Sequence, residues 1–238
     1  MLLAKKKESK SNGGKNYFVS AFWAFIVILL IKWFFPSVIP FGIFEFWTAK
    51  APLWSAIIAS WPIFLWVSTV SFIFYFLEPN SPYVNHNPEE EFLIKGFVIS
   101  AFAGLTEEIV FRWLFFLNAI WSVKLVNWLF FGWFGWGIPQ GFYTYLIVPV
   151  ANFFTLGSFA DILYHPLGWF VGAAVIIANA KFRAGHKYLG IFGYINSWFI
   201  GMFLFWLMFQ YGLLACIVVH FLYDFIIYVI RYIHAVTE

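Results

Sequence analysis

The sequence predicts an all-α fold, a polytopic transmembrane bundle of about eight helices with a polar site inside the membrane. Hydrophobic residues make up 63% of its 238 residues and aromatic residues 25%, and the mean hydropathy is +0.84, well above that of soluble domains. Several apolar runs reach the roughly 18 to 20 residues that a helix needs to cross a hydrocarbon core about 30 Å thick. Ionisable residues nevertheless occur inside these runs, where burial is costly and is usually tied to function.

Breaks at charged residues, prolines and glycines divide the chain into eight candidate spans. They cover approximately residues 16–35, 53–77, 93–121, 123–138, 142–158, 162–180, 188–209 and 212–231. The fourth is interrupted by "GWFGWGIP" and the fifth by Pro149, so we expect half-helices or re-entrant segments there. A polar, Pro- and Asn-rich loop is expected over 78–91.

Basic residues predict the orientation of the chain. The tail 1–15 carries five lysines, and further basic residues occur at 181–187 and at Arg231. The positive-inside rule places all three on the cytoplasmic side, which an eight-span chain permits, so both termini are predicted to be cytoplasmic. The remaining chain is predicted to comprise N-terminal helices with the polar loop over 16–92 and a functional core over 93–233.

Composition also limits the classes of partner. The net charge is only +3 and comes largely from the tail, so no basic stripe is available and we expect no nucleic-acid partner. The lipid bilayer is the expected environment. A single cysteine, Cys216, excludes disulfides within the chain and any multi-cysteine metal site.

The stretch "GLTEEIVFRWLFF" at 104–116 places three charged residues in an apolar segment. Glu108 and Arg112 stand four apart with the acid first, which predicts an ion pair on one helix face. Glu107 lies about 100° around the helix from Glu108 and is left without a partner on that helix. In an alternative interpretation "TEE" begins a helix at the membrane surface, with Thr106 as its N-cap.

Two further segments bring histidine and aspartate together at a spacing of four. His220 and Asp224 fall within the last apolar run, where intramembrane ionisable residues are by default functional. His165 and Asp161 occur in "FADILYHPLGWF". Asp161 is expected either to orient His165 or to lie at the start of the following helix, and Pro166 disfavours helical backbone at His165.

Carboxylates and imidazoles in a desolvated site suit two kinds of chemistry. They can activate a water molecule, or they can bind zinc or another divalent metal, with Glu107, His165 and His220 as candidate ligands. These residue types alone do not choose between the two. The chain lacks H-E-x-x-H, G-x-S-x-G and paired E-x-x-H motifs, which argues against zincin, serine-hydrolase and di-iron chemistry.

The order of these residues resembles a known family. "EEIVFR" at 107–112 is similar to the EExxxR motif of the CPBP family, the CAAX proteases and bacteriocin-processing proteases of membranes. "HFLYD" at 220–224 is similar to the family's last motif, His-x-x-x-Asn/Asp. The middle motif is Phe-x-x-x-His, and His165 lies in the right order for it, although Asp161 stands where the motif has Phe.

This resemblance implies an intramembrane endopeptidase that cuts a peptide bond near the membrane surface. It implies that Glu107 is the general base, that His165 helps to hold the water, and that His220 donates to the oxyanion. Glu108 and Arg112 would form a supporting ion pair. Asp224 replaces the amide of many relatives, and because an ionised Asp cannot donate a hydrogen bond, it is expected to orient His220, to ligate a metal or to act in its protonated form.

The substrates implied by the resemblance are peptides or proteins, including prenylated CAAX proteins and bacteriocin-like peptides. Two other classes of function use the same buried polar residues. One is a non-catalytic immunity or scaffold protein, in which the cluster serves helix packing. The other is an ion- or proton-coupled transporter, although no inverted repeat is evident in the sequence.

Overall fold

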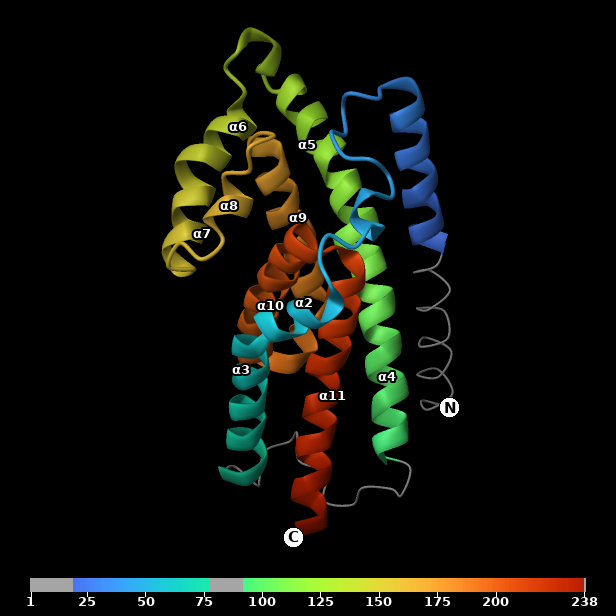
Figure 1. Cartoon of the computed structure of the whole chain (residues 1–238). Coiled ribbons are helices and arrows are strands. Elements are labelled where there is room, and N and C mark those ends of the chain that lie inside the picture. Colours follow the sequence, from blue (N-terminus) through green and yellow to red (C-terminus); the bar gives the residue numbers. More distant parts are fainter. Residues whose placement is uncertain (1–18, 78–91, 238) are drawn as a thin grey trace, which may run out of the picture. The chain divides into compact units, whose positions relative to one another are not determined.

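The computed structural model describes residues 19–77 and 92–237 (Figure 1). All regular secondary structure in these two ranges is helical, and neither contains a strand, so the predicted all-α class is confirmed for them. The predicted basic tail at 1–15 and the predicted polar loop at 78–91 lie outside the described residues.

Three of the described helices are long and apolar enough to cross a membrane. They cover Phe92–Leu129, Lys187–Tyr211 and Leu213–Thr237. The pair Leu53–Ala59 and Trp61–Phe76 adds a fourth if it is one span bent by 52°. These helices indicate an integral membrane protein.

The contacts within the chain define two compact units, and each combines segments that are distant in the sequence. Unit 1 contains Met1–Glu45 and Val110–Gly185, and unit 2 contains Phe46–Ile109 and His186–Glu238. The predicted functional core over 93–233 stays a prediction.

Unit 2 is built around two long helices, α4 (Phe92–Glu107) and α11 (Leu213–Thr237), which pack along each other (Figure 1). Small residues at every fourth position of α4, Gly96, Ser100 and Gly104, are buried. A Cβ atom on Gly104 would lie 2.9 Å from the carbonyl oxygen of Ile217, and one on Gly96 would lie 2.6 Å from the ring of Tyr228. Small residues let two membrane helices approach this closely.

The other elements of unit 2 surround this pair. The helix α11 also packs against α3 and α10. These surrounding elements are α2 (Leu53–Ala59), α3 (Trp61–Phe72), the π-helix η2 (Ile73–Leu77), the 3₁₀ turn η6 (Lys187–Leu189) and α10 (Gly190–Tyr211). A hydrogen-bond chain links three of the helices: Trp66 Nε1 donates to Asn196 Oδ1 at 2.8 Å, and Asn196 Nδ2 donates to the Tyr223 hydroxyl at 3.0 Å.

Unit 1 is built around α5 (Phe116–Leu129) and α9 (Trp169–Gly185), which pack against each other. The helix Val19–Phe34 is tied to α5 because Asn118 Nδ2 donates to the carbonyl of Ala24 at 3.0 Å. The shorter elements are η4 (Gly132–Phe134), α6 (Ile138–Phe142), the π-helix η5 (Tyr143–Ile147), α7 (Val148–Phe154) and α8 (Ala160–Leu163).

The last two predicted spans, 188–209 and 212–231, are confirmed. They correspond to the helices Lys187–Tyr211 and Leu213–Thr237. Gly212 separates them with a φ of 95°, a conformation that a side chain makes costly and that ends a helix readily.

Two predictions about the middle of the chain were wrong, the boundary between the third and fourth spans and the continuity of the sixth. The predicted boundary near residue 122 does not exist, because one helical segment runs from Phe92 to Leu129. The predicted span 162–180 is divided, because α8 ends at Leu163 and α9 begins only at Trp169. Pro166 accounts for this division, since it lacks an N–H and restricts the residue before it.

The small-residue stripe leads to a first prediction. Replacing Gly104 with Ala should lower the free energy of unfolding by about 1 to 3 kcal/mol, because the new methyl group meets the backbone of α11 rather than a movable side chain. The measurement is denaturant-induced unfolding of the purified protein in micelles. Gly141→Ala is the control, since a Cβ there has no neighbour within 4 Å. Equal stability of the two variants would contradict this packing.

Candidate polar site

The two adjacent glutamates stand at a change of helix type. Glu107 is the last residue of α4, and Glu108 is the first of the π-helix η3 (Glu108–Phe115). Thr106 is not an N-cap: α4 begins at Phe92, and the Thr106 hydroxyl donates back to the carbonyl of Phe102 at 2.7 Å. The helix-start interpretation of "TEE" is therefore wrong. Single π-turns within helices are frequent at functional sites.

A short hydrogen bond joins Glu108 to His220 of α11. Glu108 is completely buried and His220 is 4% exposed. His220 Nδ1 lies 2.7 Å from Glu108 Oε1. Because an ionised carboxylate can only accept, His220 Nδ1 donates, and such a charge-assisted bond is among the stronger ones in proteins. The bond fixes the imidazole ring and leaves Nε2 as its second functional nitrogen.

Asp224 lies on the other side of the same imidazole. Its Oδ2 is 3.7 Å from His220 Nε2, and its side chain is 29% exposed whereas that of His220 is 5% exposed. The predicted common face of these two residues is thus confirmed. The distance is too long for a direct hydrogen bond, so Asp224 acts on His220 through its charge.

Glu107 faces a histidine that our sequence analysis did not select. Its Oε2 is 3.8 Å from His186 Nε2, and the two side chains are 30% and 18% exposed. Within the described parts of the chain this oxygen is buried and accepts no hydrogen bond. Asp224 is close enough to Glu107 and His186 to interact with both charges, so the two histidine–carboxylate pairs form one cluster.

The sequence does contain a signal for His186. Phe182 and His186 stand four apart in "FRAGH", which is the Phe-x-x-x-His spacing that residues 161–165 do not satisfy. We interpreted 181–187 only as a basic segment that sets topology. That interpretation hid a match to the middle motif at the place where the structure brings a histidine to Glu107.

His165 belongs to unit 1, in the turn between α8 and α9. Its Nδ1 accepts from the backbone N–H of Leu167 at 3.2 Å, and its ring meets the ring of Phe41 at a centroid distance of 5.9 Å. The backbone at His165 is not helical, as Pro166 predicts. Asp161 is exposed in the first turn of α8, which agrees with the alternative that places it at a helix start.

Arg112 is completely buried within unit 1. Its guanidinium carbon lies 3.9 Å from the ring centroid of Phe182, a close cation–π contact. The ring of Phe111 also packs edge-on against Phe182 at 5.7 Å. The predicted ion pair of Arg112 with Glu108 joins residues assigned to different units and stays a prediction.

The predicted metal site is not found. Within 19–77 and 92–237, no three His, Cys, Asp or Glu side chains are placed so that they could hold a metal ion. A structural reason is visible at His220, whose Nδ1 is already bonded to Glu108, leaving one nitrogen for any other role. We therefore assign no step to a metal at Glu107, His165 and His220.

Comparison with known proteins gives no independent identification. No family model, no curated protein and no solved structure matches this chain. The candidate site therefore depends on the geometry of the cluster in unit 2 and on the motif spacing in the sequence.

The Glu108–His220 bond leads to a second prediction. Glu108→Ala and His220→Ala should each lower the free energy of unfolding by about 3 to 5 kcal/mol, because each leaves a buried group without its partner. The loss of unfolding free energy in the double variant should be smaller than the sum of the losses in the two single variants, with a coupling energy of about 1 to 3 kcal/mol. Unfolding in micelles measures all three, and strictly additive losses would contradict the bond.

Proposed function

We propose that this chain is an intramembrane endopeptidase that hydrolyses a peptide bond near the membrane surface. One observation carries the proposal: Glu107 Oε2 accepts no hydrogen bond within the described residues, and it faces His186 Nε2 at 3.8 Å. Both side chains are partly exposed as a whole, whereas Glu107 Oε2 itself is buried, so the proposed water would be an enclosed one. A carboxylate and an imidazole placed in this way suit general-base catalysis.

The distance between these two atoms matches one bridging water. If a water oxygen lies about 2.8 Å from each atom, the angle at that oxygen between Glu107 Oε2 and His186 Nε2 is about 85°. One water can make both contacts at this angle with moderately bent hydrogen bonds. Glu107 then accepts one proton of the water, and His186 orients the molecule. This arrangement assigns to His186 the water-holding role that the resemblance had implied for His165.

The reaction that follows is hydrolysis of the peptide bond. The water oxygen attacks the carbonyl carbon of the scissile bond as Glu107 takes a proton, and a tetrahedral intermediate forms. Glu107 next gives this proton to the leaving nitrogen, and the carbon–nitrogen bond breaks. The products are a carboxylic acid and an amine, the acid then passes its proton to the amine, and Glu107 returns to its initial state.

His220 is the proposed donor to the oxyanion. Its Nδ1 is fixed by Glu108, so Nε2–H of the imidazolium is the group that can stabilise the developing negative charge. Asp224, at 3.7 Å from Nε2, stabilises the charged ring. An ionised Asp224 does not itself donate to the oxyanion, which makes its role here one of positioning His220.

The proposal retains the finer expectations from the sequence. These are a bundle of about eight spans, cytoplasmic termini, a supporting pair of Glu108 and Arg112, and prenylated or bacteriocin-like peptides as substrates. The resemblance to the EExxxR and His-x-x-x-Asp motifs supports the reaction class. The Phe-x-x-x-His spacing at 182–186 now adds a third element in the same order along the chain.

Glu107→Gln is the third prediction. It should lower peptide cleavage by about 10² to 10⁴-fold, because an amide cannot accept the proton of the water. Stability should change little, since Glu107 is partly exposed and makes no hydrogen bond through Oε2. Cells that express each variant at matched abundance are compared by labelling and mass spectrometry of new protein N-termini in their membranes. Full cleavage by the variant would refute the proposed function.

Replacement of the two candidate water-holding histidines gives the fourth prediction. His186→Gln should reduce cleavage by about 10²-fold or more, whereas His165→Gln should retain most of it. The assay is release of the C-terminal peptide from a farnesylated CAAX peptide, and of the leader from a bacteriocin-like precursor, by the purified protein. If His165→Gln reduced cleavage more than His186→Gln did, His165 would be the residue that holds the water.

A non-catalytic scaffold is the second candidate function. The observation in its favour is the buried Glu108–His220 bond, which would serve helix packing by itself. If the protein is a scaffold, Glu107→Gln and His186→Gln should change its abundance or stability without a separate loss of cleavage products. If it is an endopeptidase, the two variants should lose cleavage products at matched abundance, so the same experiments decide between the two functions.

A further inference from the structure

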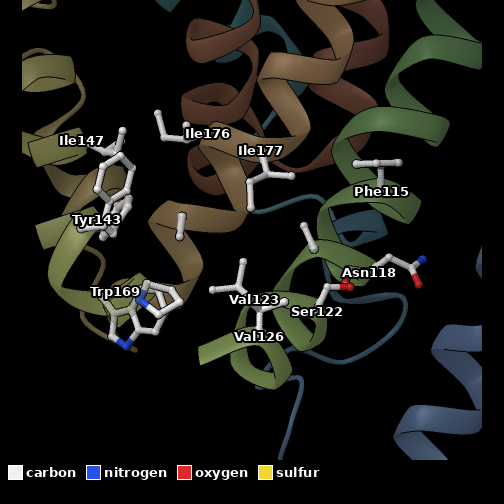
Figure 2. A pocket seen from close by; sticks show the side chains of 14 residues that line it. Phe115, Asn118, Ser122, Val123, Val126, Tyr143, Ile147, Trp169, Ile176 and Ile177 are labelled. Atoms are coloured by element: carbon white, nitrogen blue, oxygen red, sulfur yellow. The ribbon is translucent and has the colours of Figure 1, made fainter. Parts of the chain in front are cut away.

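A second feature, a cavity within unit 1, is independent of the polar cluster. It has a volume of about 640 Å³ and lies between α5, the α6–η5 segment and α9. Figure 2 shows side chains from these elements pointing into it, among them Val123, Tyr143 and Ile177. Its volume is within the range of about 300 to 1,000 Å³ that is usual for small-molecule sites.

The polar groups along the wall are largely engaged with the protein itself. The Ser122 hydroxyl donates to the carbonyl of Asn118 at 2.8 Å, and Asn118 Nδ2 donates to that of Leu114 at 2.8 Å. The Tyr143 hydroxyl donates to the carbonyl of Leu163 at 2.7 Å. No charged residue lines the cavity. Its interior therefore suits hydrocarbon rather than a charged or strongly polar ligand.

Trp169 supplies one exception. It is the first residue of α9 and lines the cavity, with its ring 6.0 Å from that of Tyr143. Among the residues that the structure describes, its indole N–H has no hydrogen-bond acceptor. Indole groups at membrane interfaces bury an apolar ring and donate to a polar group at its edge. The cavity thus combines an apolar interior with one free donor.

The wall of the cavity is preformed. Tyr143 lies against α9 at Gly172, where a Cβ atom would overlap the Tyr143 hydroxyl oxygen. The absence of a side chain at Gly172 lets Tyr143 reach its acceptor on Leu163 and fixes η5 against α9. A ligand that enters such a site does not have to order it first, which favours binding.

We propose that this cavity binds one acyl chain of a bilayer phospholipid, with the Trp169 indole donating to an ester carbonyl oxygen. The helix α5 belongs to the candidate span Phe92–Leu129, and the lining residues Val126, Phe142 and Ile177 are exposed, so the cavity opens on an apolar surface that bilayer hydrocarbon would cover. A free fatty acid would bring a carboxylate, for which the lining has no cationic partner. An ester oxygen needs only one neutral donor, and Trp169 offers one.

Photocrosslinking tests this site and gives the fifth prediction. The full chain is reconstituted in phosphatidylcholine vesicles with a trace of phosphatidylcholine that carries a diazirine on its palmitoyl chain. Crosslinks should concentrate on the cavity wall of α5, η5 and α9. Ile177→Trp should lower them about tenfold, equivalent to roughly 1.4 kcal/mol, because the indole fills the cavity. Trp169→Phe should lower them by a smaller factor.

Leu125→Trp is the matched control. Leu125 is on α5, is exposed to a similar degree as Ile177 and does not line the cavity. It should leave the crosslinks in place. Labelling spread over all exposed apolar helices, and unchanged by Ile177→Trp, would overturn the site. Stronger labelling of the same wall by diazirine palmitate at equal concentration would refute the phospholipid as the ligand and would indicate a free fatty acid.

Discussion

The cost of burying a carboxylate is the constraint on which unit 2 depends. Glu108 is completely buried, and without a partner it would oppose folding by several kcal/mol. Its bond to His220 requires the end of α4 to lie close to α11. The small residues Gly96 and Gly104 permit that approach. Packing and polar pairing therefore depend on each other, because the small residues of α4 let the two side chains come within bonding distance and the bond gives the buried carboxylate an imidazole donor.

Two adjacent acids at the change from α-helix to π-helix serve different partners. Glu107 closes α4 and lies near His186, whereas Glu108 opens η3 and bonds to His220. Their exposure differs in the same sense, 30% for the Glu107 side chain and none for Glu108. The buried acid is used to fix an imidazole. The other acid is partly exposed as a side chain and keeps one oxygen open, which is the division that the proposed water-activating site needs.

Sequence reasoning reached the helical class, the last two spans and the common face of His220 and Asp224 because each depends on local periodicity. It failed over 162–180, where hydropathy favoured one span while Pro166 divided it. It also missed His186, because the basic neighbours of that residue suggested a surface segment. Apart from the Phe-x-x-x-His spacing at 182–186, no local pattern indicates which histidine lies near Glu107, since that depends on contacts between distant segments.

The open oxygen of Glu107 is the feature that the proposed catalysis would use and that helix packing would not need. A cluster retained only for stability gains from every hydrogen bond it completes and loses free energy for each buried acceptor left open. Glu108 follows that rule at Oε1, which accepts from His220. Glu107 Oε2 departs from it among the described residues, with an imidazole nitrogen at a distance suited to a shared water. A buried acceptor without a hydrogen bond lowers stability, and a reacting water is the ligand that would occupy this one.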